Sequence, residues 1–129
     1  MVKIEGYCPS SVYNPAAYTQ GMRVTSAQTL LFLSGQVAYD KNGDASHRGD
    51  FKGQTREAFR ALKALVEDAG GTMDNIVKLN IYVTDIRYRA DLAPVRQEFF
   101  AKSPASTLVA VTALAHPDWM IEIEAIAAL

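Results

Sequence analysis

The sequence is poor in the residues that build disulfide bonds and metal centres. It contains one cysteine, Cys8, and two histidines, His47 and His116, which are far apart in the chain. A single cysteine cannot form a disulfide bond within the chain, so we expect a reducing, cytoplasmic location. Protein metal sites usually need three or four clustered ligands, and Cys8 has no evident partner base. We therefore predict neither a metal site nor a cysteine nucleophile.

Excess charge of one sign and long apolar segments are also missing. Thirteen basic residues stand against 14 acidic ones, for a net charge of -1, and the basic residues form no patch. Nucleic-acid binding through phosphate contacts therefore has little support. The longest apolar runs, such as LLFL and LVAV, are far too short to span a bilayer. Residues 1–11 lack the apolar segment of a signal peptide, so we expect no membrane partner.

The composition is that of one ordinary globular domain. The 129 residues are 49% hydrophobic and 21% charged, which is enough to build a core. The chain contains no repeat, low-complexity tract or linker. We predict that residues 1–129 form a single domain.

Two segments have apolar residues at helical spacing. The first begins after Asp50, which suits an N-cap, and continues to about Ala69, where Gly70-Gly71 ends it. The second ends near Lys102 and contains Pro94, which a helix tolerates near its first turn but not further in. Its apolar positions are Tyr88, Leu92, Val95 and Phe99.

The predicted strands lie before, between and after these helices. A short strand near the N-terminus leads into an irregular arm up to residue 20, and a first hairpin joins residues 22–25 to residues 29–37. One strand covers residues 76–83, and strands at 107–114 and 120–128 close the chain. The order β-β-α-β-α-β-β indicates an α+β fold in which two helices cover one face of a five- or six-stranded sheet.

The last nine residues, IEIEAIAAL, read as a strand with two different faces. Because strand side chains alternate, Glu122 and Glu124 share one face, and the other face is entirely apolar. Burying an unpaired carboxylate is costly, so this face either meets solvent or serves a site that needs an acid. The strand at 76–83 has a similar mixed face, with Lys78, Asn80 and Tyr82. Such a mixture favours an oligomer interface with polar clefts.

Seven segments together resemble the RidA (YjgF-like) family of reactive-intermediate deaminases over nearly the whole chain. None is diagnostic alone, but their order and spacing are specific. They are AYTQG (17–21), LSGQVA (33–38), GDFKGQTREAFRALKALVEDAGG (49–71), IVKLNIYVTD (76–85), FF (99–100), PASTLVAV (104–111) and IEIEAIA (121–127). The resemblance implies a chorismate-mutase-like α+β fold and a homotrimer whose sheets line a central barrel. It also implies small-molecule sites in the clefts between chains and hydrolysis of enamines and imines, such as 2-aminoacrylate, without a metal or organic cofactor.

The resemblance also implies site residues. Glu122 matches a glutamate that positions or activates a water molecule, and Tyr18 matches a tyrosine that lines the cleft. Ser34, followed by Gly35, matches a cleft serine. The family's carboxylate-binding arginine is absent, because PASTLVAV places Ser106, followed by Thr107, at its position; Ala93 likewise replaces a frequent asparagine. The chain therefore resembles an arginine-lacking branch.

The missing arginine changes which substrates we expect the chain to bind. Hydrogen bonds to charged groups contribute about 1.5–3 kcal/mol, or roughly 10- to 150-fold in binding. Ser106 can donate only one neutral hydrogen bond, so enamines with a free carboxylate are expected to be poor substrates. The sequence leaves open whether a cation elsewhere supplies the charge, the candidates being Arg87, Arg89, Arg96 and Lys102.

Each candidate residue also has a purely structural interpretation. Glu122 could be an interface carboxylate paired with a neighbouring chain, and Glu124 is expected to be paired or solvated. Tyr18 could pack the arm against the sheet. Ser34-Gly35 could be a turn at a strand end, and Ser106-Thr107 could bridge or cap a strand start. His116 is expected in a turn between the last two strands, and His47 in a polar loop.

Three functions remain to be compared. The first is a hydrolase of small imines or enamines that lack a carboxylate or present it differently. The second is a non-catalytic trimer that binds a small metabolite in its clefts, which Ser106 favours. The third, RNA cleavage or translational inhibition, is attached to some relatives, but the balanced charge disfavours it here.

Overall fold

Both predicted helices are present, and capping chemistry explains the bounds of the first. The computed structural model describes all residues, 1–129, and places α1 at Phe51–Asp68. The Asp50 carboxylate accepts a hydrogen bond from the amide of Gly53, which satisfies a free donor at the start of α1. Gly70 has a left-handed φ of 92°, so the chain leaves the helix where the sequence predicted.

The second helix, α2, is shorter than predicted. It spans Arg89–Phe99, and Phe100 is already extended, so the helix does not reach Lys102. Short 3-10 helices precede β4 and α2: η1 at Met73–Asn75 and η2 at Ile86–Tyr88. None of these helices combines the length and apolar character needed to cross a membrane.

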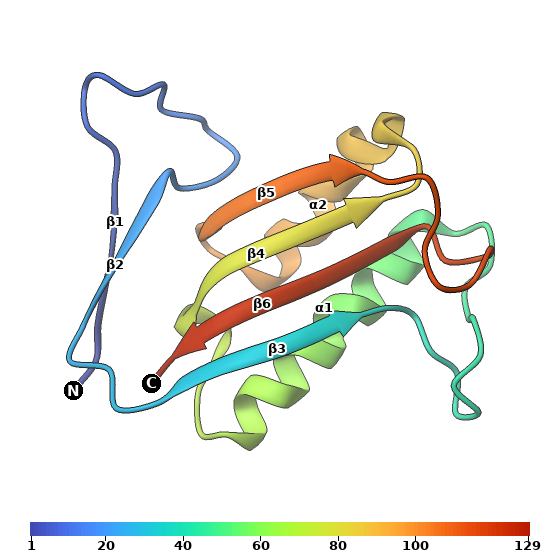
Figure 1. Cartoon of the computed structure of the whole chain (residues 1–129), viewed down its shortest axis with the longest axis horizontal. Helices are drawn as coiled ribbons and strands as arrows, with labels where there is room; N and C mark the ends of the chain where they lie inside the picture. The colour runs from blue at the N-terminus through green and yellow to red at the C-terminus, as the bar shows by residue number, and fades with distance from the viewer.

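The main sheet has four strands in the order β3-β6-β4-β5 (Figure 1). These are β3 (Leu30–Gln36), β4 (Ile76–Val83), β5 (Ala105–Ala110) and β6 (Ile121–Ala128). Strand β6 runs antiparallel between β3 and β4, while α2 connects β4 to the parallel strand β5, as expected for a strand–helix–strand unit. The strand predicted at 107–114 instead spans Ala105–Ala110. It ends at Ala110 because Val83, the residue opposite, is the last residue of its partner β4.

The predicted hairpin between the second and third strands is wrong. Strand β2 (Gly21–Thr25) pairs instead with β1 (Lys3–Tyr7) in a separate two-stranded sheet. The amides of Gln28 and Thr29 both donate to the carbonyl of Leu129, so the connection is tied to the end of β6. Strand β3 continues along β6, which leaves β2 free to pair with β1. The main sheet therefore has four strands rather than five or six.

The core lies between the main sheet and the two helices, so the α+β fold class is confirmed. Strands β4 and β6 alternate as predicted except at one end of each: Ala128, the last residue of β6, is buried although alternation places it with Glu122 and Glu124. A register shift after Ile76 buries that residue in place of Val77. The largest fully buried apolar side chains are Phe59, Leu62, Val66, Ile76, Leu79, Ile81, Val83, Leu92, Val95, Ile121 and Ile123.

The other face of the main sheet carries no helix, and in Figure 1 both helices lie behind the strands. Phe32, on β3, is 74% exposed there. We call this surface the open sheet face; from alternation and strand register, its members are Leu30, Phe32, Ser34, Lys78, Asn80, Tyr82, Thr107, Val109, Glu122, Glu124 and Ile126. Exposed large apolar groups beside charged ones indicate a contact surface.

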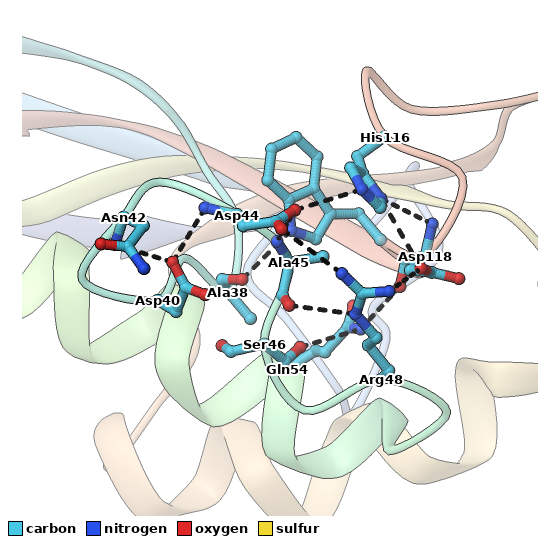
Figure 2. A network of polar contacts seen from close by, with 11 residues as sticks. Ala38, Asp40, Asn42, Asp44, Ala45, Ser46, Arg48, Gln54, His116 and Asp118 are labelled. Atoms are coloured by element: carbon cyan, nitrogen blue, oxygen red, sulfur yellow. Dashed lines mark hydrogen bonds and ion pairs between the residues drawn. The ribbon is translucent and has the colours of Figure 1, made fainter.

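A polar network joins the loop before α1 to the loop before β6 (Figure 2). His116 contacts Asp44 at 3.3 Å, and Arg48 forms an ion pair with Asp118 at 2.9 Å. The buried amide of Gln54, in α1, donates to the carbonyl of Asp118 at 2.8 Å. His116 therefore lies between the last two strands, as predicted, and takes part in holding two loops together.

Candidate functional site

Glu122 and Glu124 both lie on the open sheet face, but only one of them is held by the chain. The hydroxyl of Tyr82 donates a short hydrogen bond to the Glu124 carboxylate. The pKa of Tyr82 is raised, mainly by this hydrogen bond and secondly by partial burial of the hydroxyl. Glu122 forms no hydrogen bond and no ion pair within the chain. Glu124 is therefore a structural residue, as expected, whereas the Glu122 carboxylate is free to contact a ligand.

The Glu122 side chain lies over Gly35, and this close approach requires a glycine. A Cβ atom built at Gly35 would lie 2.1 Å from Oε1 of Glu122. The pairing of β3 with β6 shifts register between Leu33 and Gln36, so Ser34 and Gly35 form an irregular segment there. The structure thus brings three of the predicted site residues to one place: Glu122, Gly35 and the adjacent Ser34.

Thr107 shares the open sheet face but lies elsewhere on it. It is in β5, opposite Asn80 of β4, and its hydroxyl accepts a hydrogen bond from the Lys78 ammonium group at 2.8 Å. Strand β4 separates β5 from β6, so Thr107 and Glu122 are on the order of 10 Å apart across the sheet. Thr107 therefore does not touch Glu122 within one chain.

Ser106 and Tyr18 lie on the opposite side of the sheet. Ser106 pairs with the core residue Leu79, so its side chain points toward the helices. It lines a hollow of about 720 Å³ between β5, α2 and the arm, and Tyr18 lines the same hollow. We call this hollow the helix-side groove. The predicted residues are consequently divided between the two faces of the sheet: Glu122, Ser34 and Gly35 lie together on one, Ser106 and Tyr18 line the groove on the other, and Thr107 lies apart on the open sheet face.

The helix-side groove contains arginines and no acidic residue. Arg87 is engaged by Asp85, whose pKa its guanidinium lowers to about 2 through side-chain hydrogen bonds. Arg89 is exposed. Arg96 is only 8% exposed, and its burial lowers its pKa. Because Arg96 follows Leu92 by four residues, it lies on the buried stripe of α2, a signal that would have separated it from the other arginines.

The structure shows neither a base beside Cys8 nor a cluster of side chains that could bind a metal ion. The Cys8 thiol is near backbone carbonyls of the arm, at 3.5 Å from that of Val12, and has no histidine among its hydrogen-bond partners. No three His, Cys, Asp or Glu side chains come together where they could hold a metal ion. The predicted site residues lie on the open sheet face and in the helix-side groove.

Known proteins resemble this chain over most of its length. The family model described as endoribonuclease L-PSP matches residues 9–129. A RutC family protein of Pyrococcus horikoshii is 36% identical over 111 residues, which cover 85% of this chain and 85% of that protein. The structure of the Rid-family protein YyfB from Yersinia pestis has a TM-score of 0.86 at 28% identity and covers 98% of both chains. That of RidA from an Antarctic Psychrobacter species has a TM-score of 0.72 at 31% identity, covering 87% of this chain and 88% of the other.

Proposed function

The chain belongs to the RidA (YjgF-like) family, and from this we propose that it is a cytoplasmic hydrolase of small enamine or imine metabolites. One observation carries the proposal. Glu122 offers a carboxylate that has no partner in its own chain, and it lies over a glycine that leaves room for it. A half-buried carboxylate with a purely structural role is expected to have a partner, as Glu124 has in Tyr82.

The chemistry needs one group that can accept and return a proton. The Glu122 carboxylate takes a proton from water while the oxygen adds to the carbon of the C=N bond. It then returns the proton to nitrogen, which gives a carbinolamine. The carboxylate next moves the hydroxyl proton to nitrogen while the C–N bond breaks and the C=O bond forms, and a carbonyl compound and ammonia leave. An enamine enters the same path after protonation at carbon. Such general acid–base catalysis contributes about 10²–10⁴-fold to rate.

We further propose that the site is completed between chains of a homotrimer. The exposed Phe32 on the open sheet face supports an oligomer interface there. The two groups of candidate residues support a composite site, since one chain cannot bring Glu122 and Ser106 together through its own sheet. In this arrangement the open sheet face of one chain meets the helix-side groove of the next.

A non-catalytic metabolite-binding trimer is the second candidate, and Ser106 at the position of the family's arginine favours it. The family model's description names an endoribonuclease, but the net charge of -1 gives RNA binding little electrostatic support.

Replacing Glu122 with glutamine tests the hydrolase directly. With imines generated in situ, with and without a carboxylate, we expect ammonia and carbonyl release to fall about 10²- to 10⁴-fold toward the uncatalysed rate. Light scattering should give the same mass as for the wild type. Glu124→Gln is the matched control and should keep most of the activity. Unchanged turnover in Glu122→Gln would remove Glu122 from the mechanism.

Replacing Gly35 with alanine should displace the carboxylate without unfolding the chain. The new Cβ would overlap the far end of a flexible side chain, so Glu122 must swing away while the strands stay in place. We expect turnover to fall by about tenfold or more, with little change in melting temperature. In a Glu122→Gln background, Gly35→Ala should have no further effect on turnover. Additive losses in the double variant would show that Gly35 acts independently of Glu122.

A further inference from the structure

Arg96 is a buried cation without a protein partner. It is 8% exposed, yet its guanidinium forms no hydrogen bond and no ion pair. Among the other buried or half-buried charged side chains only Glu122, which is more exposed, also lacks a partner; Arg56, for example, forms an ion pair with Glu98 at 2.8 Å. Leaving a buried charge unpaired is costly, so its retention in α2 calls for an explanation.

The Arg96 nitrogens face two hollows. No side-chain nitrogen or oxygen that is fully closed off from solvent lacks a partner, so the unpaired nitrogens of Arg96 must reach open space. That space is the helix-side groove and a second hollow of about 640 Å³ beneath the arm, which we call the arm pocket. Both hollows are lined by Tyr18 and Ala93 as well as Arg96. Arg96 and Tyr18 therefore stand at the boundary between them.

The charges around Arg96 are all positive. Neither hollow is lined by an aspartate or a glutamate, and the arm pocket adds Lys102. A guanidinium stays protonated despite burial, and in a partly desolvated place it binds carboxylates in a bidentate way. Tyr18 and Ser106, which line the same helix-side groove, each carry a hydroxyl donor. The surroundings thus suit a small anion and disfavour a cation.

We propose that Arg96 is the anion-binding residue of this chain and holds the carboxylate of a small organic acid in the helix-side groove, beside Tyr18 and Ser106. A cation on α2 then takes the role that the family resemblance gives to an arginine at the position of Ser106 on β5. Carboxylate-bearing ligands become good ligands, contrary to what Ser106 alone predicts. Only the further step, in which this carboxylate belongs to the imine substrate, rests on the proposed function.

Binding of unreactive probes tests the assignment without relying on turnover. We expect propionate to shift the Nε–H NMR signal of Arg96 saturably and propionamide to leave it in place. Arg96→Gln should weaken propionate binding roughly tenfold or more, and Arg96→Lys should restore part of it. Arg89→Gln, which removes an exposed charge from the same groove, should change the affinity less than twofold. Equal binding of propionamide, or unchanged propionate binding in Arg96→Gln, would overturn the assignment.

A stability readout separates ligand binding from a structural role. In Arg96→Met, an apolar side chain of similar length replaces an unpaired buried charge, so we expect an equal or higher melting temperature together with lost propionate binding. A lower melting temperature with propionate binding retained would make Arg96 a structural residue. If propionate binding depends on Arg96 but the protein turns over no imine, the result contradicts the hydrolase proposal and supports the anion site. Normal turnover of carboxylate-bearing imines by Arg96→Gln would support the hydrolase and would contradict the role of Arg96 in holding the substrate carboxylate.

Discussion

Replacing Gln54 with leucine is expected to lower the free energy of unfolding by about 3 kcal/mol. The Gln54 side chain is fully buried, and its amide donates to the carbonyl of Asp118 while its Oε1 accepts from the amide of Met120, both at 2.8 Å. Leucine fills similar space but leaves both backbone groups buried and unpaired. Each such group costs about 1–3 kcal/mol. The loss should therefore exceed that of any surface ion pair in the same network.

Denaturant unfolding at one fixed protein concentration measures this loss. Gln97→Leu is the matched control, because Gln97 is exposed on α2 and should change the free energy of unfolding by less than about 0.5 kcal/mol. Arg48→Ala, which removes the ion pair to Asp118 shown in Figure 2, should cost at most about 1 kcal/mol. If Gln54→Leu behaved like Gln97→Leu, the loops before α1 and before β6 would not depend on the buried amide.

The parts of the fold that follow from local chemistry were predictable from the sequence. The bounds of α1 follow from the Asp50 carboxylate and the left-handed Gly70, which act on their own helix ends. The two faces of β6 follow from strand alternation. The partner of β2 was not predictable, because strand pairing is decided by distant groups. Here the decisive contact is the Leu129 carbonyl, which accepts bonds from the residues before β3.

The sequence proposes the candidate residues, but it does not predict how they are arranged. Ser106 and Thr107 are neighbours in one strand, so alternation alone requires their side chains to point to opposite faces. Which face holds the groove depends on where α2 packs. Helical spacing places Arg96 on the buried stripe of α2, but the two hollows that it lines form only where α2 and the arm meet, and the sequence of the arm does not predict that contact. The distinction between Glu122 and Glu124 required the position of the Tyr82 hydroxyl.

Introducing a charge at Phe32 should convert the proposed homotrimer into single chains. Phe32 is 74% exposed, and a phenylalanine buries about 150–250 Å² when it is covered. In Phe32→Glu, each interface would have to bury a carboxylate in place of that ring, at a cost of several kcal/mol. We expect light scattering to give the single-chain mass of 14.1 kDa instead of three times that value. Leu65→Glu, on an exposed position of α1, is the control and should leave the assembly intact.

The Phe32→Glu variant also shows whether imine hydrolysis and propionate binding each need one chain or two. If Glu122 of one chain works with the helix-side groove of the next, Phe32→Glu should lose imine hydrolysis almost completely. Propionate binding should persist, because Arg96, Tyr18 and Ser106 all line the groove of a single chain. A monomer that still hydrolyses imines would place the whole reaction within one chain. An unchanged trimer would mean that the open sheet face is not the interface, and the composite site would then lose its basis.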